Sequence, residues 1–357
     1  MILYIHIPFC TSKCGYCTFN SYAKEDHLKL EYMKALQKDI IDSLKQNTET
    51  IDSIFFGGGT PNSIESKFYG NIFEAIWKYS KISKDCEITT EANPELITQQ
   101  WCRDMQSFGV NRMSVGVQSF FDDKLLFLQR EHNYEDIHKC IDLIYQSNIK
   151  NISIDLIYDT PQDNKNRIFE EIRNASKLPI NHISAYSLSI EKDSKLAQIY
   201  EKNPQTNSFF EEIREALSEY GFHIYEVSNY SRGYKVKHNL AYWRGEEYIG
   251  CGAGAVGRKG YIRYYSQRNI EKYIKNTSKK DIEHLSKNDL DNEAIFLGLR
   301  SEVGVSLDIL KDKQEKIKIL IEEKKCHLIE ENYNKQKIQK LVANDFFIAD
   351  EIALWLM

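Results

Sequence analysis

The sequence predicts an α/β fold: a partial (β/α)6 barrel followed by a small C-terminal unit that is winged-helix-like. Three observations support this prediction. Short apolar runs alternate with helical periodicity up to about residue 190, the rhythm then changes, and the chain ends in helical stretches with a hairpin between them. Strands that alternate with helices favour a parallel sheet with helices on its outer face. Six such units are too few for a closed eight-stranded barrel, so an open or partial barrel is expected.

The six predicted strands are short apolar runs that contain several β-branched residues. They cover residues 3–7, 53–56, 87–90, 112–117, 152–157 and 182–188. Between the first two runs, apolar side chains recur at spacings of three and four, which predicts a helix with one buried face. These side chains are Leu30, Met33, Leu36, Ile40 and Leu44. We therefore expect a core barrel over residues 1–190.

An extension of this barrel is expected over residues 191–284. It begins with a helical stretch at 208–220 and a strand-like run at 222–230. A turn-rich region follows, and its glycines are Gly245, Gly250, Gly252, Gly254 and Gly257. The same region is rich in aromatic residues.

Residues 285–357 predict the winged-helix-like unit. Three helices are expected first, then a hairpin of residues 326–329 and 337–342, and last an apolar helix at 349–357. Winged helices often bind DNA, which requires a basic surface. Residues 281–357 hold 11 Lys and Arg against 16 Asp and Glu. This acidic balance favours a lid or a docking surface.

Composition excludes several classes of protein. A formal net charge of −5 argues against a nucleic-acid partner. Residues 1–9 lack the basic start and the cleavage site of a signal peptide, and no apolar run reaches the roughly 18 residues of a membrane-spanning helix. Eight cysteines, most of them scattered, fit a reducing cytoplasm better than a disulfide framework. A peripheral membrane contact stays open, as does the choice between monomer and dimer.

Three cysteines cluster in Cys10-Thr-Ser-Lys-Cys14-Gly-Tyr-Cys17, directly after the first predicted strand. Such a loop can ligate three irons of a [4Fe–4S] cluster and leave the fourth iron without a protein ligand. In radical SAM chemistry, the amino and carboxylate groups of S-adenosyl-L-methionine (SAM) bind that iron. A zinc site would need a fourth ligand, for which His6 is the nearby candidate. The loop therefore predicts a [4Fe–4S] cluster. The other five cysteines are expected to pack in the core.

Glycine and polar residues follow several predicted strands. The carboxyl ends of parallel strands meet at one edge of a sheet, where ligands bind. The turn Gly57-Gly-Gly-Thr-Pro61 allows a ligand to approach the backbone and offers N–H groups to the amino-acid part of SAM. Glu91 could accept hydrogen bonds from ribose hydroxyls, and Arg130 could pair with a carboxylate. Gln118 and Asp155 are expected in the same cavity.

These motifs together resemble the oxygen-independent coproporphyrinogen III oxidase family of radical SAM proteins. The resemblance runs nearly end to end and rests on the cysteine loop, Gly57-Gly-Gly-Thr-Pro61, Glu91-Ala-Asn-Pro94, Ser114-Val-Gly-Val-Gln-Ser119 and Ser153-Ile-Asp155. It implies a radical SAM barrel that binds a [4Fe–4S] cluster and SAM. The SAM contacts that it implies are Tyr4, Tyr16, Gly58, Gly59, Thr60, Glu91, Gln118, Arg130 and Asp155.

Two departures from the oxidase pattern favour a second branch of this family, the HemW heme chaperones. The oxidases carry a fourth cysteine where this chain has Phe19, and they have an N-terminal extension where this chain begins almost at the first strand. His238-Asn-Leu-Ala-Tyr242-Trp243 resembles the heme-associated motif of the second branch. The resemblance implies heme as a ligand near His238, and respiratory proteins that accept heme as partners.

Three functions stay open at this point. They are heme trafficking with a cluster and SAM, decarboxylation of the propionates of coproporphyrinogen III, and radical SAM chemistry on another substrate with His238 structural. Basic residues near His238 could meet heme propionates, namely Arg232, Lys235, Lys237 and Arg244. A histidine among aromatic residues is often a satisfied core residue. The competing histidines are His6, His132, His182 and His223.

Overall fold

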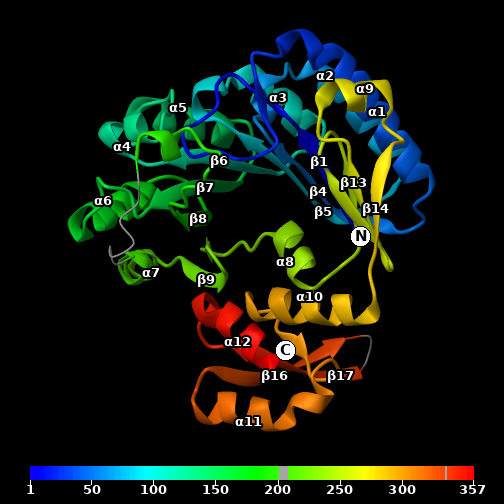
Figure 1. Ribbon diagram of the computed structural model, residues 1–357. Helices are drawn as coiled ribbons and strands as arrows, with labels where there is room; N and C mark the ends of the chain where they lie inside the picture. The colour runs from blue at the N-terminus through cyan, green and yellow to red at the C-terminus, as the bar shows by residue number, and fades with distance from the viewer. Residues whose placement is uncertain (201–207, 334–335) are drawn as a thin grey trace.

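The computed structural model describes residues 1–200, 208–333 and 336–357, and its main element is a 12-stranded mixed sheet. The strand order is β14-β13-β12-β11-β1-β4-β5-β6-β7-β8-β10-β9. The sheet curves into an open arc that carries helices on its outer side (Figure 1). Residues 201–207 and 334–335, which fall in the expected extension and C-terminal unit, lie outside the described residues.

The prediction of six parallel strands is confirmed. In chain order the strands are β1 Ile2–Ile7, β4 Thr50–Gly58, β5 Lys81–Ala92, β6 Arg112–Gln118, β7 Asn151–Tyr158 and β8 His182–Ser187. Each pairs in parallel with the next, so their carboxyl ends lie at one edge of the arc. Two short strands of the loop after β1, β2 Phe9–Cys10 and β3 Tyr22–Ala23, form a separate parallel pair.

Helices connect these strands and cover the outer face of the arc. They are α1 Lys29–Lys45, α2 Lys67–Tyr79, α3 Gln99–Ser107, α4 Asp122–Phe127, α5 Tyr134–Gln146 and α6 Lys165–Ser176. Helix α1 was predicted from five apolar side chains, and four of them are buried in the barrel core. Leu30 is the exception: it stands in the first turn of α1 with 47% of its surface exposed.

The extension completes both ends of the sheet. Its elements are α7 Phe210–Glu219, β9 His223–Glu226, β10 Asn229–Ser231, α8 Lys237–Trp243, β11 Tyr248–Cys251, β12 Val256–Lys259, β13 Ile262–Ser266, α9 Ile270–Lys275 and β14 Lys280–His284. Strand β11 pairs in parallel with β1, so the first strand lies inside the sheet. The glycine-rich region predicted as turns thus contains sheet strands and a helix. A Cβ at Gly250 would lie 2.0 Å from the Val256 carbonyl oxygen, so glycine permits the close approach of β11 and β12.

The C-terminal unit has its own small antiparallel sheet, in the order β15-β17-β16. Its elements are α10 Lys287–Leu299, β15 Val305–Ser306, α11 Gln314–Glu322, β16 Cys326–Tyr333, β17 Gln336–Ala343 and α12 Ala349–Leu356. Three helical segments precede the hairpin, as expected, although the middle one is only a short 3-10 helix, Lys311–Lys313, and the α-helices are α10 and α11. The winged-helix arrangement is not shown.

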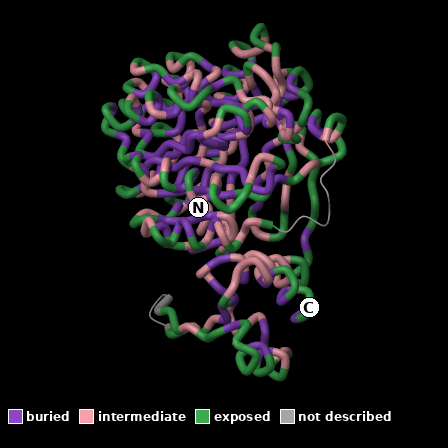
Figure 2. The backbone as a smooth tube through the Cα atoms, turned by 90° about the vertical axis from the view of Figure 1, so that its left-hand side faces the viewer, coloured by how far each residue is buried: buried purple, intermediate pink, exposed green. Residues whose placement is uncertain are grey.

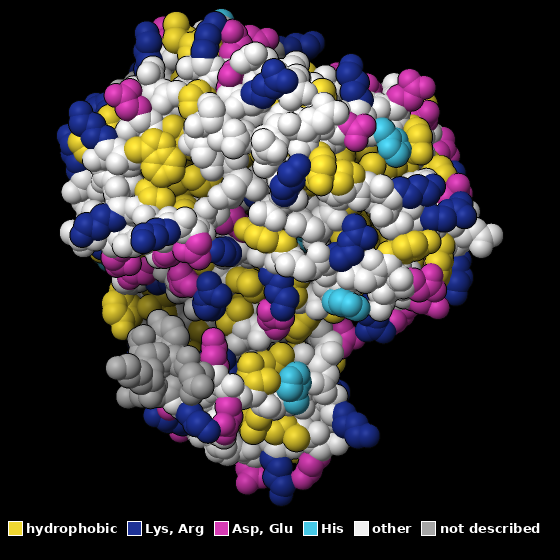
Figure 3. Space-filling model, turned by 180° about the vertical axis from the view of Figure 1, so that it is seen from behind, with side chains coloured by type: hydrophobic (Ala, Val, Ile, Leu, Met, Phe, Trp, Pro, Cys, Tyr) yellow, Lys and Arg dark blue, Asp and Glu magenta, His cyan; other side chains and the backbone are white. Residues whose placement is uncertain are grey.

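The buried residues of the C-terminal unit form a core separate from that of the barrel. Figure 2 shows both cores, a large one in the curved sheet and a small one below it. From behind, the molecule narrows between the two parts, and charges of both signs are interspersed over its surface (Figure 3). No helix within the described residues is both long and apolar enough to cross a bilayer.

Candidate functional site

Of the three clustered cysteines, Cys10 ends β2, while Cys14 and Cys17 lie in the loop between β2 and β3, beyond the carboxyl end of β1. All three are free of disulfides and half-buried. Their sulfur atoms have different partners. Thr60 Oγ1 donates to Cys10 Sγ at 3.4 Å, and Arg130 Nη1 donates to Cys14 Sγ at 3.0 Å. The Cys10 and Cys14 sulfurs are thus held from different parts of the barrel edge, whereas Cys17 Sγ lies 4.0 Å from Ser21 Oγ within the loop.

The donor set of this loop fits a [4Fe–4S] cluster. Among the residues that the structure describes, no three Cys, His, Asp or Glu side chains converge closely enough to hold a single metal ion. In a [4Fe–4S] cluster each thiolate binds a different iron, so separated sulfurs are suitable. His6 is occupied: Tyr4 Oη bonds its Nδ1 at 2.9 Å, and its Nε2 lies 2.9 Å from the Asn20 carbonyl.

The cavity beside the cysteines brings together eight of the nine predicted SAM contacts. They are Tyr16, Gly58, Gly59, Thr60, Glu91, Gln118, Arg130 and Asp155. Tyr16 comes from the cysteine loop and Arg130 from the segment after α4, and the others come from β7 and from the carboxyl ends of β4, β5 and β6, as expected for one edge of a parallel sheet. Tyr4, the ninth, lines a neighbouring cavity instead.

Arg130 holds the cysteine loop against the sheet. Its guanidinium donates to Cys14 Sγ, to Asn93 Oδ1 at 3.0 Å and to the Gly116 carbonyl at 2.8 Å. The sequence predicted that Arg130 pairs with the SAM carboxylate. The three bonds of Arg130 within the chain use Nη1 and Nη2. Its Nε is buried and has no hydrogen-bond partner among the described residues. One donor therefore remains for a ligand in this cavity.

Two half-buried carboxylates, Glu91 and Asp155, line the same cavity. Burial, reinforced by the charge of Asp155, raises the pKa of Glu91 to about 7. Burial also raises the pKa of Asp155 to about 6, although Ser114 Oγ donates to it at 3.5 Å. Carboxylates in such a setting favour a ligand that brings hydrogen-bond donors or positive charge. The ribose hydroxyls and the ammonium and sulfonium groups of SAM are such groups.

The glycine turn after β4 has a different role from the one predicted. The Gly58 N–H donates to Glu91 Oε2 at 3.0 Å, and Gly59 N–H donates to the Ile7 carbonyl at 2.8 Å. Thr60 N–H donates to the Phe9 carbonyl at 2.7 Å. These N–H groups are therefore not free for a ligand. The turn instead fixes the start of the cysteine loop to the end of β4.

A second cavity, of about 520 Å³, adjoins the first, within the size range of ligand pockets. Its lining is largely aromatic and consists of Tyr4, His6, Phe19, Asn20, Phe55, Gly58, Glu91, His238, Asn239, Tyr242, Tyr248, Gly254 and Val256. Phe19, Gly58 and Glu91 line both cavities. A ligand here would lie next to a ligand in the cysteine cavity.

His238 lies on α8, on the concave side of the sheet, and is 3% exposed. Its ring centroid is 5.0 Å from that of Phe55 and 5.1 Å from that of Tyr242, and its Nδ1 shares a hydrogen bond with Ser53 Oγ at 2.8 Å. Its Nε2 is buried without a partner in the described structure. Burial, with the charge of Arg112, lowers the pKa of His238 to about 3. The imidazole is thus neutral near pH 7, and one nitrogen is unused.

The basic residues predicted to meet heme propionates do not line this cavity. Arg232 donates to the Ile180 carbonyl at 2.8 Å, while Lys235, Lys237 and Arg244 form ion pairs with Glu302, Asp85 and Glu246, respectively. Among the competing histidines, His132 and His182 are buried and hydrogen-bonded, whereas His223 is exposed. Of these histidines, His238 is the one that lines the aromatic cavity and has a ring nitrogen without a hydrogen-bond partner in the described structure.

Sequence reasoning missed two buried carboxylates that hold α8. Glu87 accepts the backbone N–H groups of Lys237 at 2.9 Å and His238 at 3.1 Å. Glu226 accepts hydrogen bonds from the side chains of Asn239 and Trp243. Glu87 stands in a predicted strand, where a buried acid next to apolar residues is itself a signal. For Glu226, nothing in the local sequence indicated burial.

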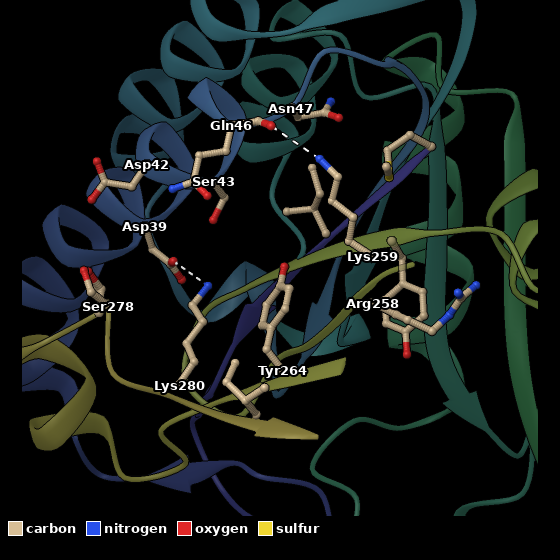
Figure 4. Close-up of a pocket in the computed structure, with 15 residues that line it drawn as sticks. Asp39, Asp42, Ser43, Gln46, Asn47, Arg258, Lys259, Tyr264, Ser278 and Lys280 are labelled. Atoms are coloured by element: carbon tan, nitrogen blue, oxygen red, sulfur yellow. Dashed lines mark hydrogen bonds and ion pairs between the residues drawn. The ribbon is translucent and has the colours of Figure 1, made fainter. Parts of the chain in front are cut away.

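A further cavity lies at the opposite ends of β1 and β11 and is lined by residues such as Met1, Asp39 and Lys280. Figure 4 shows that two lysines of this cavity bond within the chain: Lys280 Nζ lies 3.1 Å from Asp39 Oδ1, and Lys259 Nζ lies 3.4 Å from the Gln46 carbonyl. None of its lining residues has a buried polar atom without a partner in the described structure. This cavity therefore has no group that requires a ligand.

Comparisons with known proteins agree with this geometry. The radical SAM superfamily matches residues 4–175. A Bacillus subtilis protein named heme chaperone HemW is 33% identical over 85% of this chain and 84% of its own length, and a Buchnera aphidicola protein of the same name is 32% identical over 99% and 93%. The solved coproporphyrinogen III oxidase (HemN) from Escherichia coli has the same fold, with a TM-score of 0.82 over 99% of this chain and 89% of its own, at 17% identity.

The sheet and the cysteine loop define a radical SAM protein, a class that uses a [4Fe–4S] cluster and SAM. Within this superfamily, the chain belongs to the HemW family.

Proposed function

We propose that this protein is a [4Fe–4S]- and SAM-dependent heme chaperone, which binds heme through His238 and passes it to respiratory proteins in the cytoplasm. The observation that carries the proposal is the unused Nε2 of a neutral imidazole beside an aromatic cavity. With the ring proton on Nδ1 and donated to Ser53, Nε2 keeps a lone pair for iron.

The cofactors would occupy the cysteine cavity. Cys10, Cys14 and Cys17 would ligate the cluster, which with SAM supplies one-electron chemistry when bound. Arg130 would keep the Cys14 sulfur in place and use its free Nε toward the SAM carboxylate. Glu91 and Asp155 would accept hydrogen bonds from the rest of SAM.

The heme would occupy the neighbouring cavity. Phe55 and Tyr242 flank the imidazole, and Tyr4 stacks near Phe55 at 6.2 Å, so aromatic surface is available for a porphyrin face. The relatives named heme chaperone support this assignment, because they match most of the chain. The shared lining of the two cavities would place heme next to SAM.

The test is hemin titration of the anaerobically reconstituted protein, followed by its Soret band. His238→Ala should lower hemin affinity severalfold and change the Soret band, while the cluster spectrum stays. His223→Ala, an exposed histidine, is the matched control and should bind hemin as the wild type does. Wild-type hemin affinity in a folded, cluster-containing His238→Ala variant would disprove the assignment.

A further inference from the structure

The helix that carries His238 presents two adjacent faces with different partners. His238 and Tyr242 are four residues apart and share the face toward the aromatic cavity. Asn239 and Trp243, also four residues apart, share the next face. Helix α8 has only seven residues, so its own hydrogen bonds cannot fix its orientation strongly. Contacts from outside the helix must do so.

Glu226, the last residue of β9, binds the second face. Its Oε1 accepts from Asn239 Nδ2 at 2.9 Å and from Asn229 Nδ2 at 2.7 Å, and its Oε2 accepts from Trp243 Nε1. The side chain is completely buried. All three neighbours are donors, so both carboxyl oxygens are needed as acceptors, and an amide NH2 in place of one of them would face a donor. A buried carboxyl group loses its hydration, and these three donors replace it.

The backbone of Glu226 is itself fixed by the C-terminal unit. Glu226 forms a β-bridge with Ser301, just beyond α10. The next residue, Val227, donates its N–H to the Arg300 carbonyl at 2.8 Å, and Glu302 donates to the Tyr225 carbonyl at 2.9 Å. Glu226 therefore connects the C-terminal unit to α8: its backbone bonds the C-terminal unit, and its carboxylate bonds Asn239 and Trp243 of α8.

We propose that Glu226 is a positioning residue for heme binding: through Asn239 and Trp243 it sets the orientation of α8 and thereby aims His238 Nε2 at the heme iron. The inference rests on the proposed heme site and adds a residue that does not touch the ligand. It also gives Asn239 and Trp243 of the motif a defined role, since both are anchors for this carboxylate.

A double-mutant cycle on the full-length, reconstituted protein tests the proposal, with hemin as the probe. Glu226→Gln keeps the shape but turns an amide NH2 toward donors. Hemin binding should become about threefold to tenfold weaker, and the Soret band should move toward that of His238→Ala. In the His238→Ala background, Glu226→Gln should have no further effect, because it acts through the missing imidazole. Glu302→Gln, an exposed neighbour without a bond to α8, is the control.

Each other outcome has a definite meaning. Wild-type hemin binding by Glu226→Gln, or an additive loss in the double variant, would overturn the positioning role while the heme site stands. Unchanged binding by His238→Ala would remove the heme site and the positioning role with it. If Glu226→Gln fails to take up a cluster, Trp243→Phe replaces it in the same cycle. It removes one donor and keeps the ring, and it should produce a smaller loss in the same direction.

Discussion

Arg130 Nε and His238 Nε2 are two of the few polar atoms buried without a partner in the described structure, and each belongs to a different cavity. Such an atom costs free energy in the unliganded protein, and a ligand that bonds it recovers that energy. The pair therefore marks one donor in the cysteine cavity and one nitrogen beside the aromatic cavity, where we propose that SAM and heme bind. The two cavities share Gly58 and Glu91, so the two ligands would be neighbours.

Cysteine substitutions should separate cluster ligands from core residues. Cys10→Ala, Cys14→Ala and Cys17→Ala should each abolish the brown colour and the iron and sulfide content after anaerobic reconstitution, because two thiolates do not hold the cluster. Cys102 is buried in the barrel core, so Cys102→Ala should keep the brown colour and the iron and sulfide content. Iron and sulfide analysis with absorption spectra measures this. Stoichiometric zinc without iron in the anaerobically purified protein would contradict the cluster assignment.

Gly58→Ala should destabilise the protein and lower cluster content. Gly58 has φ +115°, and an added Cβ would lie 2.3 Å from the buried His6 ring, so both backbone strain and a clash are expected, together about 2–4 kcal/mol. Gly233→Ala is the control, because Gly233 has φ +95° and open space around it. Thermal unfolding of both variants isolates the clash. Equal losses would show that His6 moves away freely.

The sequence predicted the residues of the cysteine cavity well, because short motifs at successive strand ends must meet at one edge of a parallel sheet. It also predicted Tyr4 as a SAM contact, which stays a prediction: Tyr4 lines the neighbouring aromatic cavity, which shares Gly58 and Glu91 with the cysteine cavity. It missed Glu226, because burial of that carboxylate depends on donors 13 and 17 residues away and on the C-terminal unit. Tertiary contacts of this kind leave no periodic signal.

At the scale of elements, the six core strands were predictable because buried parallel strands are continuous apolar runs. Strands β11 and β12 were not predicted, since glycines are typical of turns. Here the glycines allow neighbouring strands to approach each other closely. Helix α8 was hidden in the same region. It is too short to show helical periodicity, and its N-terminus is capped by Glu87 from β5 rather than by a local residue.

The attachment of α8 to β9 should depend on pH. Burial raises the pKa of Glu226 to about 7 although Asn239, Trp243, Asn229 and Arg112 all lower it. The folded pKa lies above the unfolded value of about 4.5, so this group stabilises the folded state below pH 4.5, and that contribution is lost as pH rises toward 7. Between pH 5 and 8 the wild type should lose stability relative to Glu226→Gln, by a few kcal/mol. Denaturant unfolding of both proteins at pH 5 and pH 8 measures this loss. If the difference in unfolding free energy between the wild type and Glu226→Gln is the same at both pH values, Glu226 does not titrate with a raised pKa.

At the scale of the whole molecule, the barrel and the C-terminal unit have separate cores joined by contacts near Glu226. Leu341→Ala, at a completely buried position in the smaller core, should cost about 2–5 kcal/mol in that unit. Hydrogen exchange should accelerate over residues 285–357 and at the β9–β10 turn, with the cluster retained. Exchange that accelerates equally over β4–β7 would show instead that the two cores unfold as one.

The position of β1 inside the sheet has a consequence for synthesis on the ribosome. One edge of β1 can pair with β4 early, but the other edge, at Ile2–Ile5, pairs with Tyr248–Cys251. At about 5–20 residues per second, that apolar edge stays open for roughly 12 to 50 s. An open strand edge is a template for wrong pairing. A factor that binds nascent chains would therefore find its segment in β1 and would be displaced only when β11 emerges.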